Sequence, residues 1–232
     1  MLPRPQTLAK DSDMEATMAG ALGEALERAA RHAPFLRAQI ERHTDLADLL
    51  GRGDLVGALA ACASRLDDAP VARRLRLERA RTALVLAVGD LAGRLTLEQV
   101  TEALSDLADR SLDRAIAAAI EERAPGESPR GFAVIALGKH GGRELNYSSD
   151  IDPILLYDPV TLPRRAREDV GEAAVRIGRR VIELLQARDP DGYVFRVDLR
   201  LRGRHDQEPR RARPRRTRGS AQRRRPAVST RA

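Results

Sequence analysis

The sequence lacks tryptophan, has a single cysteine and is poor in aromatic residues, which make up only 3% of its 232 positions. With Cys62 as the only thiol no internal disulfide can form, and we expect it to be a small buried hydrophobe in a reducing compartment. The N-terminus lacks the apolar core of a secretory signal, and the longest apolar runs are far too short to span a membrane. The absences argue against a disulfide scaffold and a membrane protein and predict a soluble, cytoplasmic chain.

Most of the chain also lacks a net positive charge, although the formal net charge of the whole sequence is +7. Residues 203–232 contain eleven arginines against Asp206 and Glu208, a net charge of +9, so the first 202 residues sum to −2. A like-charged block without hydrophobic periodicity predicts a disordered basic tail. A nucleic-acid arm, a localisation patch and a changed reading frame or gene model near residue 203 all remain open. We favour the last, because the sequence switches abruptly near residue 203 to a low-complexity run of Arg, Pro and Ala. A nucleic-acid arm would also need aromatic residues on which bases could stack, and the tail has none.

The first half of the chain shows helical spacing of its apolar residues and no β-branched alternation. Thr96 followed by Gln99 predicts a capping box at the start of one helix. The arginines between residues 73 and 81 are expected to form a solvated helix face together with Glu78. A polar stretch with Pro and Gly at 121–129 reads as a linker, so residues 1–128 are predicted to be a helical domain and linker. The predicted helices cover 14–31, 35–50, 54–65, 71–91 and 97–123.

The second half contains an apolar strand at 131–137, a glycine-rich turn and then two aspartates, Asp150 and Asp152. Because side chains alternate along an extended segment, both carboxylates should project to one side while Ile151 points into the core. Mg²⁺ is usually held by one or two carboxylates, waters and substrate phosphates. The pair therefore predicts a divalent-cation site for phosphate chemistry.

A third carboxylate is expected from Asp198, within a predicted half-buried strand at 193–202. Arg196 and Arg200 flank it on the same face, where they would either neutralise phosphate or pair with Asp198. A predicted helix at 165–188 and a turn at 189–192 complete an α/β domain at 129–202. The apolar face of the strand is formed by Tyr193, Phe195, Val197, Leu199 and Leu201.

Further residues of the turn are candidates for phosphate binding. Gly141 and Gly142 would let the backbone approach a phosphate closely, and Gly138 ends the preceding strand. Lys139 would contact phosphate or be an ordinary surface residue. Ser149 would either donate a hydrogen bond to phosphate or cap the local turn.

Gly138-Lys139, ten intervening residues and Asp150-Ile151-Asp152 resemble the DNA polymerase beta-like nucleotidyltransferase superfamily. The longer motif from Leu137 to Asp152, with 195–202 after it, resembles bacterial glutamine synthetase adenylyltransferase, a bifunctional adenylylating and adenylyl-removing enzyme. The motif is closer to the first, adenylyl-removing domain of that family.

The resemblance implies an α+β protein: an all-α N-terminal domain followed by a polymerase beta-like nucleotidyltransferase domain. It implies removal of AMP from a tyrosine of glutamine synthetase by phosphorolysis to ADP, rather than addition of AMP from ATP. It also implies two Mg²⁺ ions on Asp150, Asp152 and Asp198, and the PII signal protein as a further partner.

The sequence departs from the family pattern at three places. His140 replaces an aliphatic residue, which we expect to be tolerated because a turn position need not be core. Pro153 follows the second aspartate and could tilt it. The basic tail replaces a longer folded sequence, so 129–202 is expected to be truncated. Two alternatives stay open: nucleotidyl transfer to another acceptor, and a non-catalytic fragment that only binds partners.

Overall fold

The computed structural model describes residues 7–64, 69–199 and 210–211, and for 7–19 and 210–211 it describes the backbone only. Most of this part of the chain is helical, and the strands form one small sheet. The α+β class expected from the sequence is confirmed. No helix within the described ranges is both long and apolar enough to cross a membrane.

Six helices precede the sheet: α1 (Thr7–His32), α2 (Pro34–Arg42), α3 (Thr44–Gly51), α4 (Leu55–Ala61), α5 (Val71–Leu91) and α6 (Leu97–Arg123). The single helix predicted at 35–50 is wrong, because the chain breaks at His43, whose φ of −118° and ψ of 61° are not helical. The predicted capping box is confirmed: Thr96 accepts from the Gln99 backbone, and the Gln99 side chain accepts from the Thr96 backbone.

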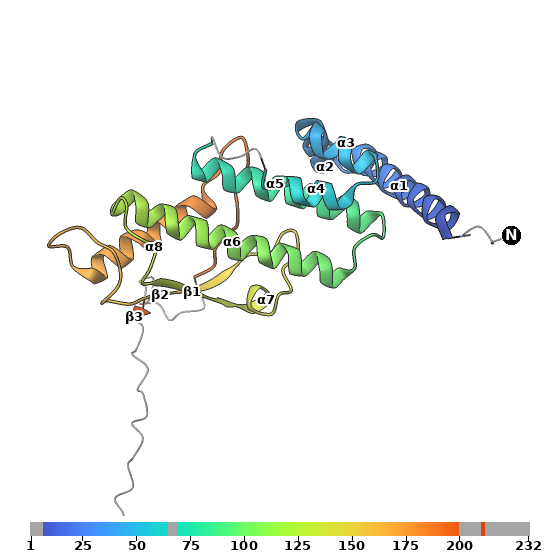
Figure 1. The fold of residues 1–232 in the computed structure, drawn as a ribbon. Coiled ribbons are helices and arrows are strands. Elements are labelled where there is room, and N and C mark those ends of the chain that lie inside the picture. Colours follow the sequence, from blue (N-terminus) through green and yellow to red (C-terminus); the bar gives the residue numbers. More distant parts are fainter. Residues whose placement is uncertain (1–6, 65–68, 200–209, 212–232) are drawn as a thin grey trace, which may run out of the picture.

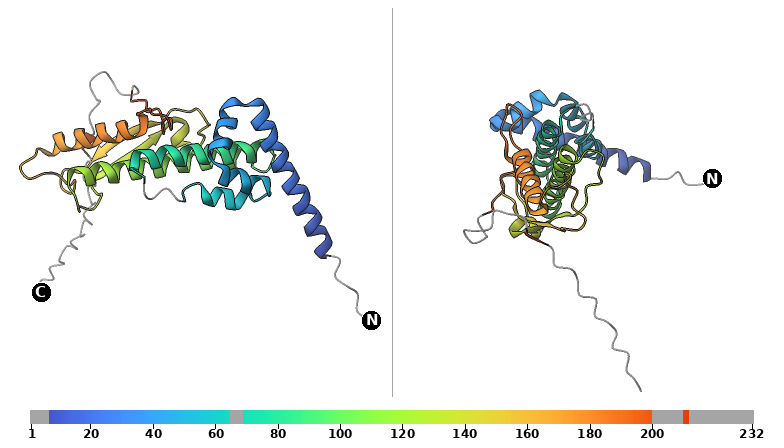
Figure 2. Two further views of the ribbon diagram at one scale, coloured as in Figure 1. Left: turned by 90° about the horizontal axis from the view of Figure 1, so that it is seen from above. Right: turned by 90° about the vertical axis from the view of Figure 1, so that its left-hand side faces the viewer.

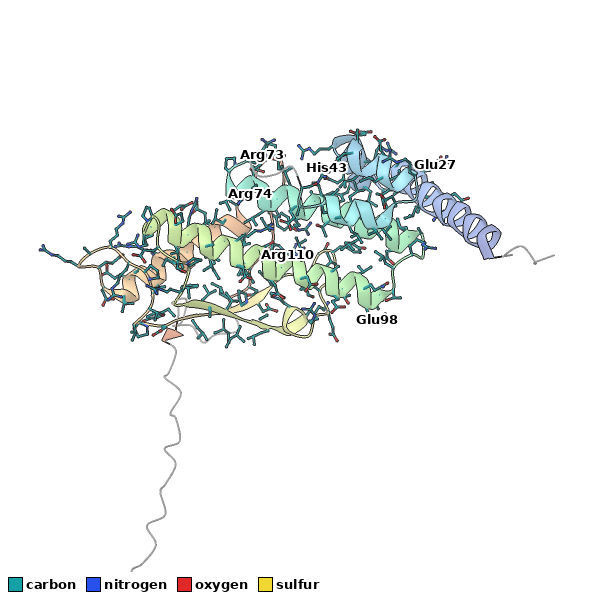
Figure 3. The ribbon with its side chains drawn as sticks, viewed as in Figure 1. Glu27, His43, Arg73, Arg74, Glu98 and Arg110 are labelled. Atoms are coloured by element: carbon teal, nitrogen blue, oxygen red, sulfur yellow. The ribbon has the colours of Figure 1, made fainter. Side chains whose placement is uncertain are left out.

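The expectation of a solvated arginine face on α5 is wrong. Glu78 is only 2% exposed, and Arg76 and Arg81 are also buried. Glu78 pairs with Arg110 and Arg114 of α6, and Arg81 pairs with Asp45 of α3. α5 lies between other helices, so these buried charges are paired rather than solvated. Figure 3 labels Arg110 on α6 and Arg73 and Arg74 near the beginning of α5.

The sheet is built from β1 (Phe132–Leu137), β2 (Asp152–Tyr157) and the two-residue β3 (Arg210–Arg211). β1 and β2 are antiparallel, with Leu137 opposite Asp152 and Ala136 opposite Pro153, and β3 is parallel to β2. The register continues through the buried Pro153, which is the second residue of β2. This placement near a strand start is one that proline tolerates.

Two further helices belong to this half of the chain: the short α7 (Gly138–Gly141) and α8 (Val170–Gln186). The apolar stripe that periodicity predicts for α8 is buried except at its first residue, Val170. Its buried members are Ala173, Ala174, Ile177, Val181, Leu184 and Leu185. α6 and α8 pack together on one side of the sheet, with α5 and then α1–α4 farther away (Figures 1 and 2).

Two hydrophobic cores organise the molecule. One combines residues of α5 and α6 with Ile151, Tyr157, Phe195 and the inner face of α8. The other lies among α1, α3, α4 and α5. Since α5 contributes to both cores, the sheet is held firmly against the helical region, and the boundary at residue 128 remains a prediction from sequence.

Candidate functional site

Ile151 is the residue that brings the separate aspartates together. Its backbone N–H donates to the Arg196 carbonyl at 2.9 Å, and its carbonyl accepts from the Asp198 N–H at 2.9 Å. These two bonds form a parallel bridge between Ile151 and Val197. Asp150 and Asp152 flank Ile151, so the bridge sets Asp198 beside them, at the beginning of β2.

The predicted half-buried strand at 193–202 is wrong over its described part. Residues 193–199 form only the isolated bridge at Val197 rather than a continuous strand. Val194 and Phe195 are both buried, and the N–H groups of both donate to the Leu185 carbonyl of α8 at 3.0 Å. The end of α8 therefore interrupts the alternation that the sequence suggests. Arg200, predicted to bind phosphate, lies outside the described residues, as does the basic tail apart from the backbone of β3.

The aspartates influence one another electrostatically. Partial burial raises the pKa of Asp152, and the neighbouring carboxylates of Asp198 and Asp150 raise it further, while His140 acts in the opposite direction. A bound cation, or a phosphate with its counter-ions, would relieve the repulsion between these carboxylates.

Arg196 pairs with Asp150 rather than with Asp198. Its guanidinium donates to the Asp150 carboxylate and, at 2.7 Å, to the Ser148 carbonyl. The pair is half exposed, so its net contribution to stability is small. The arginine fixes the segment that leads into Asp150 and lies ready to face an anion.

The carboxylates suit Mg²⁺ in chemical type, since this ion prefers oxygen ligands and retains waters. Even so, no group of three His, Cys, Asp or Glu side chains within residues 7–64, 69–199 and 210–211 is arranged to hold a metal ion. Asp150 is turned toward Arg196, which explains part of this result. Metal binding at this edge would need the Asp150 carboxylate to exchange its arginine partner for the cation.

The glycine turn packs tightly against the acidic edge. Gly138 has a φ of +57°, and a Cβ there would lie 2.7 Å from Asp152 Oδ2. At Gly141 a Cβ would lie 2.5 Å from the Ala136 carbonyl oxygen. Gly142 has no such close neighbour. Gly138 thus allows the turn to approach Asp152, whereas Gly141 is needed for packing within the protein.

His140 is not the exposed turn residue that the sequence suggested. It is 3% exposed, and its Nε2 lies 2.8 Å from Asp109 Oδ1 on α6. Arg143, with a φ of +59°, contacts Asp106 Oδ1 at 2.6 Å. The turn is therefore anchored to α6 by two side chains, and Glu102, Asp106 and Asp109, spaced along one helical face, are the sequence signal that could have revealed it.

The remaining turn residues have plainer surroundings. Ser149 Oγ donates to Asn146 Oδ1 at 2.9 Å and accepts from the Asn146 N–H at 3.1 Å. These are the bonds of a local turn cap, one of the two roles expected for Ser149. Lys139 is exposed next to Gly138.

Comparison with known proteins identifies the family. A family model described as "Glutamate-ammonia ligase adenylyltransferase" matches residues 19–209. The chain belongs to this family. The resemblance proposed from the motifs around Asp150 and Asp198 is thereby confirmed.

Curated relatives of the family carry the name "Bifunctional glutamine synthetase adenylyltransferase/adenylyl-removing enzyme". The protein from Xanthobacter autotrophicus is 42% identical over 159 residues, which cover 64% of this chain and 16% of the relative. The one from Rhizobium meliloti is 36% identical, covering 72% and 17%. The one from Rhodopseudomonas palustris is 38% identical over 222 residues, covering 82% and 22%. The chain therefore spans about a fifth of the length of these relatives.

Proposed function

We propose that this chain carries the nucleotidyl-transfer site of an adenylyl-removing enzyme that acts on glutamine synthetase. The observation that carries the proposal is the pairing of Ile151 with residues 196–198, which sets a third carboxylate beside Asp150 and Asp152. Family membership and the names of the relatives supply the substrate. The sheet would then be the core of a polymerase beta-like fold in the cytoplasm.

The reaction is phosphorolysis of adenylyl-tyrosine. An oxygen of inorganic phosphate attacks the phosphorus of the adenylyl group, the bond from phosphorus to the tyrosine oxygen breaks, and that oxygen takes up a proton. The products are ADP and an unmodified tyrosine. Because the displacement leaves charge on both the entering and the leaving oxygens, the site must stabilise negative charge on two sides of one phosphorus.

Asp150, Asp152 and Asp198 would hold one or two Mg²⁺ ions, which supply that charge stabilisation when bound. Arg196 would turn from Asp150 toward a phosphate oxygen as the cation takes its place, and Arg200 would assist from the same segment. Gly138 keeps the turn close to Asp152, and Lys139 is positioned next to it to contact phosphate. Gly141, Gly142 and Ser149 shape the backbone around that contact.

Anchoring to α6 serves this function by holding the turn. His140 and Arg143 connect the turn to Asp109 and Asp106, and the helix itself is fixed in the core of the molecule. A turn held this way loses little entropy when a phosphate binds. PII would act from outside this segment, on the position of the helical region relative to the substrate protein.

The test is incubation of the chain with adenylylated glutamine synthetase, Mg²⁺ and inorganic phosphate, with ADP measured over time. Release of ADP that stops with EDTA and resumes with Mg²⁺ supports the proposal. ADP formation at an unchanged rate in EDTA contradicts the proposed metal site. A folded sample that binds glutamine synthetase but releases no ADP supports the alternative of a binding fragment, and turnover of another adenylylated acceptor alone supports a different substrate.

A further inference from the structure

A cavity of about 530 Å³ lies between the helical region and the loop that leads into Asp150. Its walls come from α2, α5, residues 147–148 and the turn at 190–193. The volume falls within the range of small-molecule sites. Phe35 at this cavity is 58% exposed, so a large apolar side chain faces solvent there.

The turn that forms one wall is fixed by arginines. Asp191 is paired with Arg42 of α2 at 3.1 Å and with Arg73 of α5 at 3.0 Å, and Asp189 is paired with Arg76. The wall is therefore preformed, which lowers the cost of ordering it around a ligand. These pairs also use up the carboxylates of the turn.

Arg79 is the cationic group of the cavity that is left without an acid. It donates to the Tyr147 carbonyl at 2.8 Å and lies over the rings of Tyr193 and Phe195, at 5.5 and 5.7 Å from their centroids. Within the described residues no carboxylate lies at ion-pair distance from it, and its Nε has no hydrogen-bond partner. Burial lowers the pKa of Arg79, in keeping with a desolvated guanidinium whose charge is not matched.

Most of the remaining lining is flat or apolar, and Gln39 and Ser148 add uncharged polar groups. Tyr147 and Tyr193 contribute rings, and Leu36, Ala80 and Ala83 contribute aliphatic surface. Aromatic and aliphatic walls with one convergent charged group are typical of a site that binds an apolar body and orients it through a single anion.

We propose that this cavity binds a small molecule that has a flat apolar body and one phosphate or carboxylate group. The anion is held by Arg79, and the body packs against Tyr147, Tyr193 and Phe35. The site is separate from the aspartate edge, and its existence does not depend on that edge being catalytic.

The cavity is nevertheless connected to the aspartate edge by a short chain of contacts. Arg79 holds the Tyr147 carbonyl, and Arg196 holds both the adjacent Ser148 carbonyl and Asp150. An anion can use the unpartnered Nε of Arg79 while another nitrogen of the same guanidinium keeps the Tyr147 carbonyl. An anion that moves this guanidinium would therefore also move the loop that carries Asp150.

The experiment measures equilibrium binding of four probes to the full chain in EDTA, so that no cation can recruit a nucleotide to the aspartates. AMP carries a phosphate on a flat body, indole-3-acetate carries a carboxylate, and adenosine and indole-3-acetamide are their neutral counterparts. We expect at least one anion to bind about tenfold or more tightly than its neutral counterpart, the scale of a charge-assisted hydrogen bond. The anion that binds distinguishes a phosphate ligand from a carboxylate ligand.

Variants locate the site. Arg79→Gln should weaken anion binding about tenfold or more. Ala87→Leu, which fills the cavity from α5 and leaves the charge in place, should weaken anion and neutral probe alike. Arg52→Gln, an exposed arginine elsewhere, and Asp152→Asn should leave binding unchanged.

Circular dichroism establishes that each variant is folded. If Arg79→Gln does not fold, Ala87→Leu decides the result. The proposal is overturned if neither anion saturates the wild-type chain, if the folded cavity variants bind as the wild type does, or if Asp152→Asn abolishes binding.

Discussion

Two regions of this molecule differ in how their charged side chains are arranged: opposite charges pair on α5, whereas like charges gather at the edge of the sheet. On α5 two buried charges are matched by acids or bases of neighbouring helices: Glu78 pairs with Arg110 and Arg114, and Arg81 pairs with Asp45. At the edge of the sheet Asp150, Asp152 and Asp198 lie close together, and partial burial raises the pKa of Asp152, with a further increase from the two neighbouring carboxylates. Both regions are rich in charge, but only at the edge do three carboxylates lie close together.

The difference separates structural from functional charge. Matched pairs on α5 satisfy groups that the helix must bury, and they hold neighbouring helices in register. The crowding of carboxylates at the edge costs stability, which a protein tolerates where the charge has a chemical function. The comparison predicts that substitutions of the paired charges on α5 damage folding, whereas substitutions at the edge damage activity.

Asp152→Asn should give the largest effect. It removes one carboxylate from the proposed site and should lower ADP release by about a thousandfold, the scale on which phosphoryl-transfer sites lose rate without their charge-stabilising groups. The measurement is ADP formation from adenylylated glutamine synthetase together with the thermal midpoint. Asp113→Asn, an exposed aspartate on α6, is the matched control. Unchanged ADP release from folded Asp152→Asn would refute the role of the edge.

Ile151→Ala tests how much the buried side chain between Asp150 and Asp152 contributes to stability. Ile151 is 0% exposed between Asp150 and Asp152, and losing its side chain should cost about 2–5 kcal/mol of unfolding free energy. Ile135→Ala is the matched control on β1, where 47% exposure predicts a loss below about 1 kcal/mol. Urea unfolding measures both. Equal losses would show that Ile151 does not hold the edge in the core.

The sequence predicted those features that depend on local spacing. The bounds of α5 and α6, the Thr96 capping box and the buried face of α8 follow from periodicity and from a cap that involves only nearby residues. Asp150 and Asp152 could be singled out for the same reason, since side chains two residues apart in an extended chain are expected to share one side.

Features that depend on distant partners could not be predicted in this way. The alternation at 193–202 predicts a strand. In the structure the Leu185 carbonyl accepts hydrogen bonds from two consecutive N–H groups, and Val194 is buried. In the sequence His140 and the charged residues of α5 look like surface residues. In the structure α6 covers His140, and the turn at 189–192 packs against α5. Tertiary packing overrides local pattern at these positions.

Glu78→Gln should have a moderate effect on stability. The substitution removes a buried charge that two arginines of α6 contact, and those arginines are half exposed and can be hydrated again. We expect a loss of about 1–3 kcal/mol, below the cost of stranding a fully buried partner. Glu27→Gln on α1, an exposed position labelled in Figure 3, should change little. Comparable losses for the two variants, measured by urea unfolding, would contradict the structural role of the α5 pairs.

The smallest effect is on the pH dependence of stability, because the charged groups of the two regions should shift the thermal midpoint in opposite directions. The hydrogen bond from Arg81 lowers the pKa of Asp45, so its stabilising contribution is present above the unfolded-state value and is lost as pH falls through the folded one. Asp152 has a raised pKa, so its ionised form destabilises the fold at neutral pH, and acidification through that pKa removes the penalty. Asp45→Asn should therefore lower the thermal midpoint at pH 7 and make the midpoint fall less steeply toward about pH 4. Asp152→Asn should raise the midpoint at pH 7 and make it fall more steeply. Each change should amount to a few degrees at most. Shifts of the same sign in both variants would mean that the acidic edge is balanced like α5, and the contrast between structural and functional charge would not hold.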